Sequence, residues 1–574
     1  MEEMKREVAI EKELEMKNLK EIVNLTRMAL EDEKKKEKWE EIRTSFGIYT
    51  EGKKGTYMVR PRFLGSKITS DNLRFLLEKA EKYGDGRLHM TTRQDLQFHG
   101  VKRENIAELL EEISTRGFFT KSTGGNGARA VTIPPTTGFE DEVYDVSIHG
   151  KIITDYILEG KDFIGLPRKY KISLANKEEN SLYPKVNDLG FVAQVNDGIK
   201  GFRVYVAGGL GPVSTNAVIL REFIEEDEIL YYVHAIRNLF NDYGNRKVKA
   251  RARLRYVMLN MGEEKFLELC NSYIENLYKE KGDSLKRFTR NLIDRYKKDT
   301  NEKKDDTIKL FSEIRRNERN LENKENIKVT EEKKDFLKDP NIVAGKNGER
   351  YGYYLRPVHG NIYPEDGGKI IEFTESLDYE VELKITSDQR FLLKNLKKGD
   401  VLKLKDLMKE YHGRNDFFNS YSCIGSTTCN LGILDTPPIL EYIFKYFESE
   451  EKRELTDYLP QLSFSGCPNS CARSQTAALG FSGKRKKDGE YFTIFARGDF
   501  TGKIVKLNEV IGEIKASRIP YFLEEIAKVL KAEKIKFKDY TGSRKFEELI
   551  KKYENVEVED VDFTEFRRLE ERVW

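Results

Sequence analysis

Hydrophobic and polar positions alternate along this chain with two different periods. Runs rich in β-branched and aromatic residues, such as TYMVRPRFL (56–64) and EYFTIFARGD (490–499), are typical of short strands. Between such runs lie segments with apolar residues every three or four positions, such as SDNLRFLLEKAEKYG (70–84) and IPYFLEEIAKVLKAE (519–533), which predict amphipathic helices. The mixture predicts α+β domains.

Two segments lack this mixture. Residues 1–45 are rich in Glu, Lys, Leu and Met and contain no Pro or Gly, which predicts a solvated helical extension. Residues 276–340 are highly charged and have few apolar anchors, which predicts a partly helical linker. A chain of 574 residues is too long for one hydrophobic core, so we expect this linker to join two halves.

The two halves resemble each other. Four pairs of short segments match in the same order, separated by about 295 residues with a slow drift. Such a repeat predicts a duplicated fold whose two copies surround one central site. The matches are Arg60-Pro61 with Arg356-Pro357, Thr91 with Thr386, Leu166-Pro167 with Leu459-Pro460, and Gly190-Phe191 with Gly480-Phe481.

Four of the five cysteines form two pairs, Cys423 with Cys429 and Cys467 with Cys471. Structural zinc usually takes tighter C-x2-4-C spacings, and thiol redox chemistry favours C-x-x-C. An iron–sulfur cluster also uses four thiolates and accepts wider loops, so the spacing favours the cluster while zinc stays open. Cys270 ends the helical pattern EEKFLELC and is expected to be a buried core thiol.

Three motifs together resemble the sulfite and nitrite reductases that contain sirohaem: TTRQDLQFHG (91–100), LPRKYK (166–171) and SGCPNSCARS (465–474). The resemblance covers most of the chain from about residue 46. It implies an internally duplicated α+β fold, with two ferredoxin-like half-domains and two α+β domains that bind sirohaem and cluster, related by a pseudo-two-fold. The implied parts are a helical extension (1–45), a ferredoxin-like half-domain (46–120), a sirohaem and substrate domain (121–275), a charged linker (276–340), a second ferredoxin-like half-domain (341–412) and a domain with the cluster and the axial thiolate (413–574).

The resemblance also implies an oxidoreductase. Its reaction is the six-electron reduction of a small oxyanion, with sulfite to sulfide favoured and nitrite to ammonia as the alternative. The implied cofactors are sirohaem and a 4Fe–4S cluster held by Cys423, Cys429, Cys467 and Cys471, of which Cys471 also links the cluster to the sirohaem iron. A non-catalytic zinc- or haem-binding protein is the alternative from another class.

By the same resemblance, an anion pocket is expected from Arg60, Arg129, Lys169 and Lys171. The repeat would place Arg129 near the counterpart of Cys423, and the two lysines near the segment that matches the second cysteine pair. Nitrite-specific members tend to have Asn where Lys171 stands, and two lysines suit the sulfite dianion, so sulfite is favoured.

Sirohaem carries eight carboxylates and needs many donors. Alternation along a single strand is expected to place His89 and the polar residues that follow it on one side, although the resemblance predicts Arg at position 89. The glycines of VAGGLGPVS (206–214) would suit a flat cofactor. The expected cofactor-binding residues are His89, Thr91, Arg93, Gln97, His99, Asn469 and Cys471, with the cationic run KVKARARLR (247–255).

Charge is balanced, with 101 Lys and Arg against 98 Asp and Glu, so neither nucleic acid nor a membrane is expected as a partner. The chain has no apolar segment long enough to cross a membrane and no secretion signal at its start, and a cytoplasmic location is expected. Since no flavin or nicotinamide fingerprint is found, electrons should come from ferredoxin or another electron-donor protein. The lysines of GKRKKDGE (483–490) fit a docking surface or, equally, a solvated hairpin.

Overall fold

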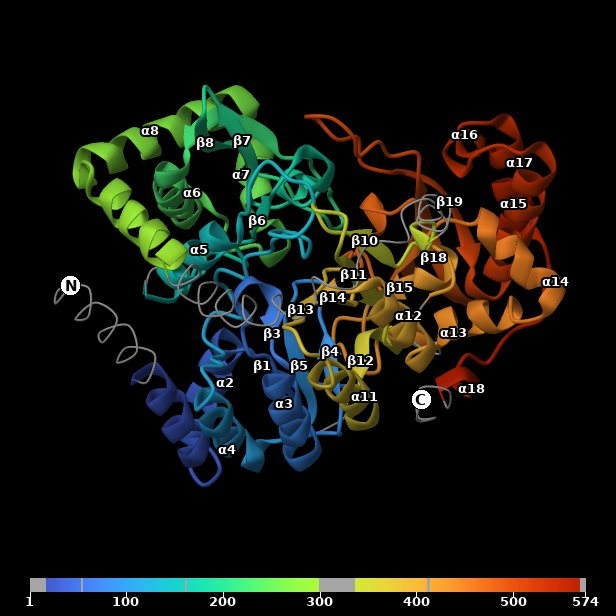
Figure 1. Cartoon of the computed structure of the whole chain (residues 1–574), viewed down its shortest axis with the longest axis horizontal. Helices are drawn as coiled ribbons and strands as arrows, with labels where there is room; N and C mark the ends of the chain where they lie inside the picture. Colours follow the sequence, from blue (N-terminus) through green and yellow to red (C-terminus); the bar gives the residue numbers. More distant parts are fainter. Residues whose placement is uncertain (1–16, 53–54, 160–162, 299–335, 410–412, 568–574) are drawn as a thin grey trace, which may run out of the picture.

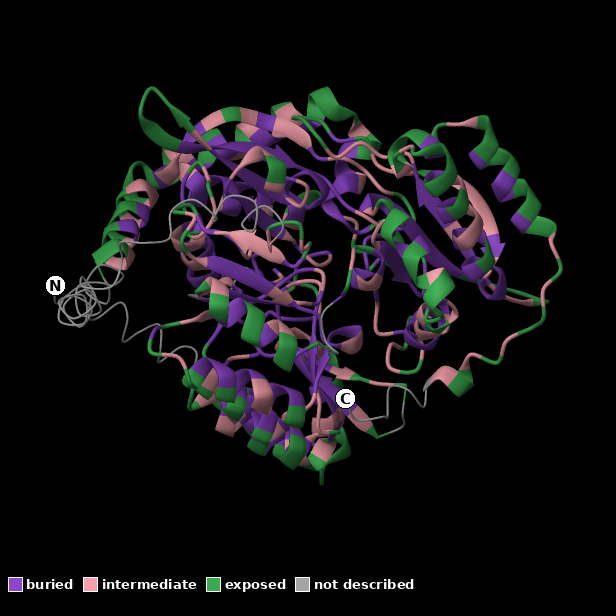
Figure 2. Ribbon diagram, turned by 45° about the vertical axis from the view of Figure 1, so that its right-hand side comes forward, coloured by how far each residue is buried: buried purple, intermediate pink, exposed green. Residues whose placement is uncertain are grey.

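The computed structural model describes residues 17–52, 55–159, 163–298, 336–409 and 413–567 (Figure 1). Two small sheets lie next to each other in the middle of the molecule. Larger α/β units, one on each side, carry the remaining two sheets. Strands are buried in the interior, whereas exposed residues concentrate on the outer helices (Figure 2).

The first small sheet is antiparallel and has the order β1-β2-β5-β4-β12. Leu73, Leu76, Leu77 and Ala80 line one face of a covering helix at helical spacing and are buried in the core beneath it. The elements of this unit are α2 (Glu33–Ile42), β1 (Ile48–Thr50), β2 (Thr56–Val59), α3 (Ser70–Tyr83), β4 (Leu88–Met90), β5 (Leu96–Lys102), α4 (Arg103–Ser114) and the added strand β12 (Asn361–Ile362).

The second small sheet repeats this design in the order β10-β11-β14-β13-β3. Its elements are β10 (Ile342–Ala344), β11 (Tyr351–Leu355), α11 (Pro364–Glu375), β13 (Glu382–Ile385), β14 (Phe391–Leu396), α12 (Lys398–Leu407) and the added strand β3 (Lys67–Ile68).

Each small sheet is completed by a strand from the other half. In the first sheet Ile362 pairs with Leu88, and in the second Ile68 pairs with Leu383. The exchange is reciprocal, because the two donated strands occupy equivalent places in the repeat. The two small sheets therefore form one joined unit rather than two independent domains.

Two glutamines form a second pair of reciprocal contacts between the halves. Gln94 Nε2 donates to the carbonyl oxygen of Ile385 at 3.2 Å, and Gln389 Nε2 donates to that of Met90 at 3.1 Å. Both glutamines have a left-handed backbone with a φ of 63°. These paired contacts identify the pseudo-two-fold that the repeat predicts, and the expected duplicated α+β class is confirmed.

The two larger sheets are also equivalent. Gly190 lies opposite Ser173 in one sheet, and Gly480 lies opposite Ser463 in the other, which confirms the glycine match read from the sequence. The first unit contains α5 (Ser147–Glu159), β6 (Ile172–Ala175), β7 (Leu189–Asn196), β8 (Ile199–Val206), β9 (Val218–Glu225), α6 (Ile229–Tyr243), α7 (Leu254–Met261) and α8 (Glu263–Lys281). The second contains β15 (Tyr421–Ser422), α13 (Thr436–Tyr446), α14 (Glu450–Arg453), β16 (Leu462–Ser465), β17 (Leu479–Lys486), β18 (Gly489–Ala496), β19 (Glu509–Lys515), α15 (Ile519–Glu533), α16 (Phe537–Thr541), α17 (Arg544–Asn555) and α18 (Thr564–Arg567).

The N-terminal extension is not the solvated helix that was expected. Residues 1–16 lie outside the described part, but 17–28 are helical, and Ile22 and Trp39 are fully buried in the core of the first small sheet. Trp39 Nε1 also donates to Thr26 Oγ1 at 2.9 Å. The charged composition hid these apolar anchors, which make the extension part of the core.

The expected linker boundary at residue 276 is wrong, because it falls inside α8. A further helix over 284–298 follows and buries Ile293 in the same core. The first half therefore continues to residue 298 at least. Residues 299–335 of the expected linker lie outside the described part.

Candidate active site

Cys423 and Cys467, the first cysteine of each pair, meet at one edge of a large sheet. Because β15 and β16 run parallel, Cys423 and Cys467, which follow them, leave the sheet on the same side. The Gly466 N–H donates to Cys423 Sγ at 3.1 Å. A Cβ on this glycine would lie 2.5 Å from the Leu434 carbonyl oxygen, so only glycine permits the approach.

The other two thiols lie close to this pair. Cys429 N donates to the Gly425 carbonyl in the turn after Cys423. Burial and repulsion from Cys471 together raise the pKa of Cys423 to about 11, and burial also raises the pKa of Cys429 and Cys467, with Cys471 as a charged neighbour of both. Cys471 itself is exposed. We call these four residues the four-cysteine centre.

The donor set fits an iron–sulfur cluster better than zinc. In the described part of the chain, no three His, Cys, Asp or Glu side chains converge closely enough to hold one metal ion, which a tetrahedral zinc site requires. A 4Fe–4S cluster offers a separate iron to each thiolate. Gly466 N and Asn469 Nδ2, the latter 3.4 Å from Cys467 Sγ, supply hydrogen bonds to sulfur of the kind that tune such clusters.

Two ammonium groups face this centre. Lys169 and Lys171 precede β6, and both interact electrostatically with Cys471. Burial, with repulsion from Arg253, lowers the pKa of Lys169 to about 8, and burial with repulsion from Lys169 lowers the pKa of Lys171 well below its usual value. Neither ammonium has a hydrogen bond or an ion pair with any described residue.

Arg129 and Arg60 belong to the same cluster of cations. Arg129 donates to the carbonyl oxygens of Gly124 at 2.6 Å and Gly125 at 2.7 Å, so its own loop holds it. Burial is the main cause that lowers its pKa to about 10, and Arg60 adds repulsion. Arg60 Nη1 donates to the carbonyl of Thr123 in the same loop at 3.1 Å.

The charged run at 247–255 has an exposed first part and a buried second part. Lys247, Lys249 and Arg251 are exposed, whereas Arg253 and Arg255 are buried. Among the described residues nothing accepts a hydrogen bond from Arg255 Nε or Nη1, and a Cβ on Gly209 would lie 2.4 Å from Nη1. The glycine loop therefore makes room for a buried guanidinium whose donors suit a cofactor carboxylate.

Asp188 is the functional residue that the sequence reasoning missed. It is fully buried, accepts from Arg253 Nη2 at 2.7 Å and accepts from the Lys171 backbone N–H at 2.8 Å. Its carboxylate lies among the surrounding cations and anchors the segment that carries both lysines. We call the cations of this site the cationic pocket: Arg60, Arg93, Arg129, Lys169, Lys171 and Arg253.

The correspondence between thiols and cations expected from the repeat is wrong at residue level. Thr132 and Tyr421 occupy the same position in the two equivalent strand pairs. Cys423 therefore corresponds to Pro134, and Arg129 lies before the strand rather than after it. The lysines likewise precede β6, whereas the second cysteine pair follows β16.

Residues 88–99 form a hairpin rather than the single strand that was expected. Thr91 Oγ1 accepts from the N–H groups of Arg93 at 3.2 Å and Asp95 at 3.0 Å, so it caps the turn. His89 still lies opposite Gln97 and shares its face, because the turn preserves the alternation. Thr91 is thus a turn residue whose hydroxyl still has its own proton to donate, and its expected role in binding the cofactor stays a prediction.

The two histidines of this hairpin have different surroundings. His89 Nδ1 lies 2.9 Å from Asn361 Oδ1 and Nε2 lies 3.3 Å from Gln389 Nε2, so His89 joins the two halves, and its expected role in binding the cofactor stays a prediction. His99 Nδ1 lies 2.5 Å from Glu51 Oε1, whereas its buried Nε2 has no partner in the described residues. Burial lowers the pKa of both rings.

Arg93 belongs to the cationic pocket and Gln97 contacts it through Arg60, and their expected role in binding the cofactor stays a prediction. Arg93 Nη2 donates to the Ile172 carbonyl at 3.2 Å, while its buried Nε has no partner in the part of the chain described. Burial lowers the pKa of Arg93 to about 9. With its amide oxygen turned toward Arg60, Gln97 accepts from Arg60 Nε at 2.8 Å.

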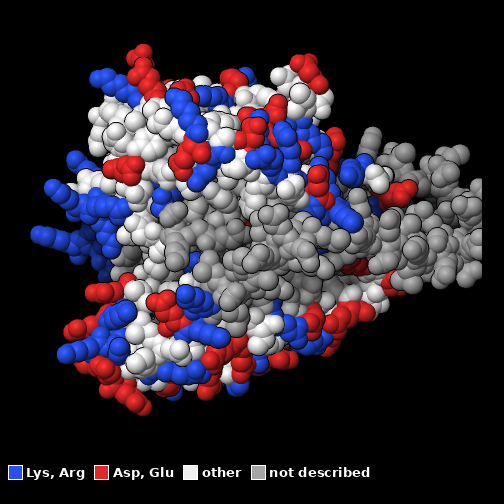
Figure 3. Space-filling view, turned by 90° about the vertical axis from the view of Figure 1, so that its left-hand side faces the viewer, with Lys and Arg blue, Asp and Glu red and all other residues white. Residues whose placement is uncertain are grey.

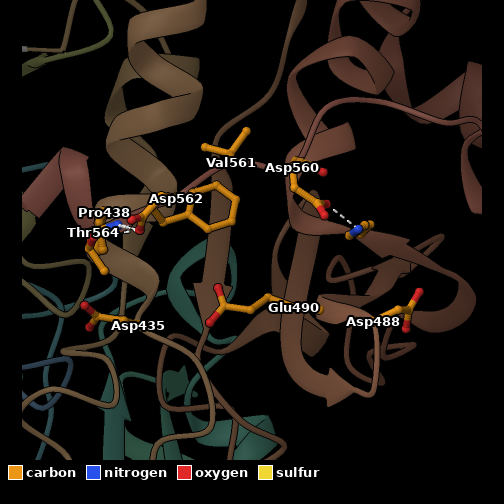
Figure 4. Close-up of a pocket in the computed structure, with 12 residues that line it drawn as sticks. Asp435, Pro438, Asp488, Glu490, Asp560, Val561, Asp562 and Thr564 are labelled. Atoms are coloured by element: carbon orange, nitrogen blue, oxygen red, sulfur yellow. Dashed lines mark hydrogen bonds and ion pairs between the residues drawn. The ribbon is translucent and has the colours of Figure 1, made fainter.

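A cavity of about 230 Å³ lies on the outer side of the second large sheet, between the β17–β18 hairpin and the C-terminal segment (Figure 4). Its lining is rich in carboxylates, and one of them, Asp560, pairs with Lys515 at 2.5 Å. Asp435 connects the cavity to the four-cysteine centre, because it accepts from Thr427 Oγ1 at 2.9 Å. The acidic lining does not suit an anionic substrate.

Among the residues coloured in Figure 3, Lys and Arg are interspersed with Asp and Glu in the upper and lower parts of the face, and Lys and Arg gather at the left edge. Two lysines of 483–490 share one carboxylate, since Lys484 and Lys486 both pair with Glu513 at 2.6 and 2.7 Å. This segment is the β17–β18 hairpin. No helix of the described residues has both the length and the apolar character needed to cross a membrane.

A duplicated fold that brings four cysteines against a cationic pocket fits the class of oxidoreductases that act on a small oxyanion. The model of the nitrite and sulphite reductase 4Fe-4S domain matches residues 124–277 and 413–556, and that of the nitrite/sulfite reductase ferredoxin-like half domain matches residues 50–115. Since these matches cover more than half of the chain, it belongs to the nitrite and sulfite reductase family, whose cofactors are sirohaem and a 4Fe–4S cluster.

Similar proteins include both kinds of reductase. A ferredoxin–nitrite reductase of Synechococcus elongatus is 26% identical, covering 76% of this chain and 78% of that protein. A sulfite reductase (NADPH) hemoprotein beta-component of Lysinibacillus sphaericus is 25% identical, covering 82% of each chain. The solved NirA protein of Mycobacterium tuberculosis shares the fold, with a TM-score of 0.69 and 19% identity over 88% of this chain and 90% of that one.

Proposed function

We propose that this enzyme reduces sulfite to sulfide in a six-electron reaction. The observation that carries the proposal is the pair Lys169 and Lys171, whose ammonium groups face Cys471 and have no partner among the described residues. Two half-buried cations that repel each other are stabilised by a ligand that brings two negative charges. Sulfite as a dianion supplies this charge, whereas nitrite supplies half of it.

In this proposal the four-cysteine centre holds the 4Fe–4S cluster, and Cys471 also links it to the sirohaem iron. The exposure of Cys471, in contrast to buried Cys467, supports that assignment. Unpartnered donors at Arg93 and Arg255 would bind sirohaem carboxylates. When bound, the two cofactors supply the electrons and the iron that coordinates the anion.

The chain's own task is to bind the anion and move protons. Lys169, with a pKa of about 8, exchanges its proton readily near neutral pH. A bound dianion favours the protonated form of both lysines, so substrate binding draws protons into the pocket. Each oxygen that leaves as water takes two protons together with two of the six electrons, and the lysines would pass on these protons and regain them from solvent. Arg129, held by its glycine loop, keeps the anion oriented.

Nitrite reduction to ammonia is the second candidate, and the similarity to ferredoxin–nitrite reductases supports it. The same similarity supports ferredoxin as the electron donor, with another donor protein as the alternative. Purified protein loaded with sirohaem, supplied with reduced ferredoxin and either anion, tests both points. Sulfide as the preferred product supports the first candidate, whereas preferred ammonia supports the second.

A further inference from the structure

Cys471 is held in an unusual backbone. Its neighbours Ser470 and Arg473 both have left-handed conformations, with φ of 52° and 62°, although neither is glycine. Such conformations are unfavourable for residues other than glycine and persist only where the surroundings hold them. The loop that presents the exposed thiol therefore needs tertiary contacts to keep its shape.

Arg473 supplies one set of these contacts. Its side chain is 9% exposed, and its guanidinium reaches both hairpin turns of the small sheets, donating to the carbonyl oxygens of Ser387 and, over a longer 3.5 Å, of Thr92. The turns are equivalent in the repeat, since each closes with a 2.8 Å backbone hydrogen bond and contains a left-handed glutamine. The guanidinium also lies over the ring of Tyr183, 4.5 Å from its centroid. Arg473 thus bridges the pseudo-two-fold.

Thr92 supplies the other contact. Its Oγ1 donates to the carbonyl oxygen of Cys471 at 3.0 Å. Thr92 belongs to the first half, whereas Cys471 belongs to the second, so this bond fixes the thiol loop against the half that carries the cationic pocket. Neighbouring Thr91 uses its side chain for the turn itself, which leaves Thr92 pointing toward Cys471.

We propose that Arg473 and Thr92 are positioning residues that fix the direction of the Cys471 thiol, and thereby the electronic coupling between cluster and haem iron. The inference rests on the proposed function, in which Cys471 links the two cofactors. Neither residue belongs to the cationic pocket. Their effect acts through the thiol loop, as outer partners of metal ligands commonly act.

The test uses full-length holoenzyme with Arg473→Lys, Thr92→Val and Thr92→Ser. Arg518→Lys is the matched control, because Arg518 is also 9% exposed and donates to two backbone carbonyls away from the thiol loop. Thr115→Val is the control for threonine, since Thr115 Oγ1 donates to the Glu112 carbonyl. For each variant, sirohaem and iron content, the magnetic coupling of haem and cluster by Mössbauer and electron paramagnetic resonance, both reduction potentials, and kcat and KM are measured.

We expect Arg473→Lys and Thr92→Val to retain both cofactors but to weaken the magnetic coupling, shift the potentials and lower kcat by about 10- to 100-fold with KM unchanged. Thr92→Ser should restore the coupling, and both controls should match the parent protein. Unchanged coupling and potentials in Arg473→Lys and Thr92→Val would overturn the inference alone. A parent protein without a haem chromophore would overturn the proposed function and the inference with it.

Discussion

Asp188 accepts two hydrogen bonds from the guanidinium of Arg253, at 2.7 and 3.2 Å, and both side chains are buried. Removing one partner of a buried ion pair leaves the other charge uncompensated. Asp188→Ala should therefore destabilise the protein by about 3 to 5 kcal/mol. A thermal unfolding scan checks this, with Asp71→Ala as control, because the Asp71–Arg116 pair is exposed and should contribute less than about 1 kcal/mol. Equal shifts in the two variants would contradict the anchoring role of Asp188.

Lys171→Asn should change the preferred substrate. Loss of one charged hydrogen bond is expected to lower kcat/KM for sulfite by about 10- to 100-fold and to leave nitrite within a few-fold of the parent. Steady-state kinetics with reduced methyl viologen measures both. Lys247→Asn, which removes an exposed cation, is the control. If both anions were unaffected by Lys171→Asn, the assignment of the anion pocket would be wrong.

Anion binding should weaken as pH rises through about 8. The pKa of Lys169 is lowered to about 8 in the folded protein, so the ammonium that binds the anion is lost above that pH. The KM for nitrite, whose own charge is constant in this range, should rise between pH 7 and 9. Lys169→Arg should remove this rise, because a guanidinium stays protonated. A flat profile in the parent would argue against Lys169 as a binding group.

The same shift affects stability. The folded protein disfavours protonated Lys169, which keeps its proton up to about 10.5 when unfolded, so the unfolded state binds more protons between these values. The contribution of Lys169 to stability should therefore increase as pH rises from about 8 toward 10.5. The free energy of unfolding is measured against pH for the parent and for Lys169→Met, and the difference between the two curves is the contribution of Lys169. Parallel curves would contradict the prediction.

Cys471→Ser should disconnect the two cofactors. We expect haem and cluster to lose their magnetic coupling and six-electron turnover to disappear, whereas Cys270→Ser should keep both signals, because Cys270 is a core thiol of α8. Spectroscopy of the purified variants decides this. Normal turnover in Cys471→Ser would refute the linking role.

The sequence predicted the features that local pattern determines. The duplicated α+β class followed from the ordered matches, and identical registers at Gly190 and Gly480 confirm one of them. The correspondence of Arg129 with Cys423 failed because loops of different length separate equivalent strands. The turn at Thr91 was missed because it contains neither Gly nor Pro, and its left-handed residue is Gln94.

The local sequence pattern could not predict contacts between residues that lie far apart in the chain. Asp188 forms its ion pair with Arg253, a residue far away in the sequence. Nothing in the sequence around Asp188 distinguishes it from an ordinary surface acid. The exchange of β3 and β12 between halves likewise depends on tertiary contacts of very short strands. The contact between His89 and Asn361 could not be predicted for the same reason, since Asn361 comes from the other half.

The most direct test of the proposed function is anaerobic turnover by the purified, sirohaem-loaded protein with reduced methyl viologen, in which sulfide and ammonia are quantified against electrons consumed. The account predicts one sulfide for every six electrons and a higher kcat/KM for sulfite than for nitrite. Formation of neither product, or of ammonia with the higher kcat/KM, would contradict it.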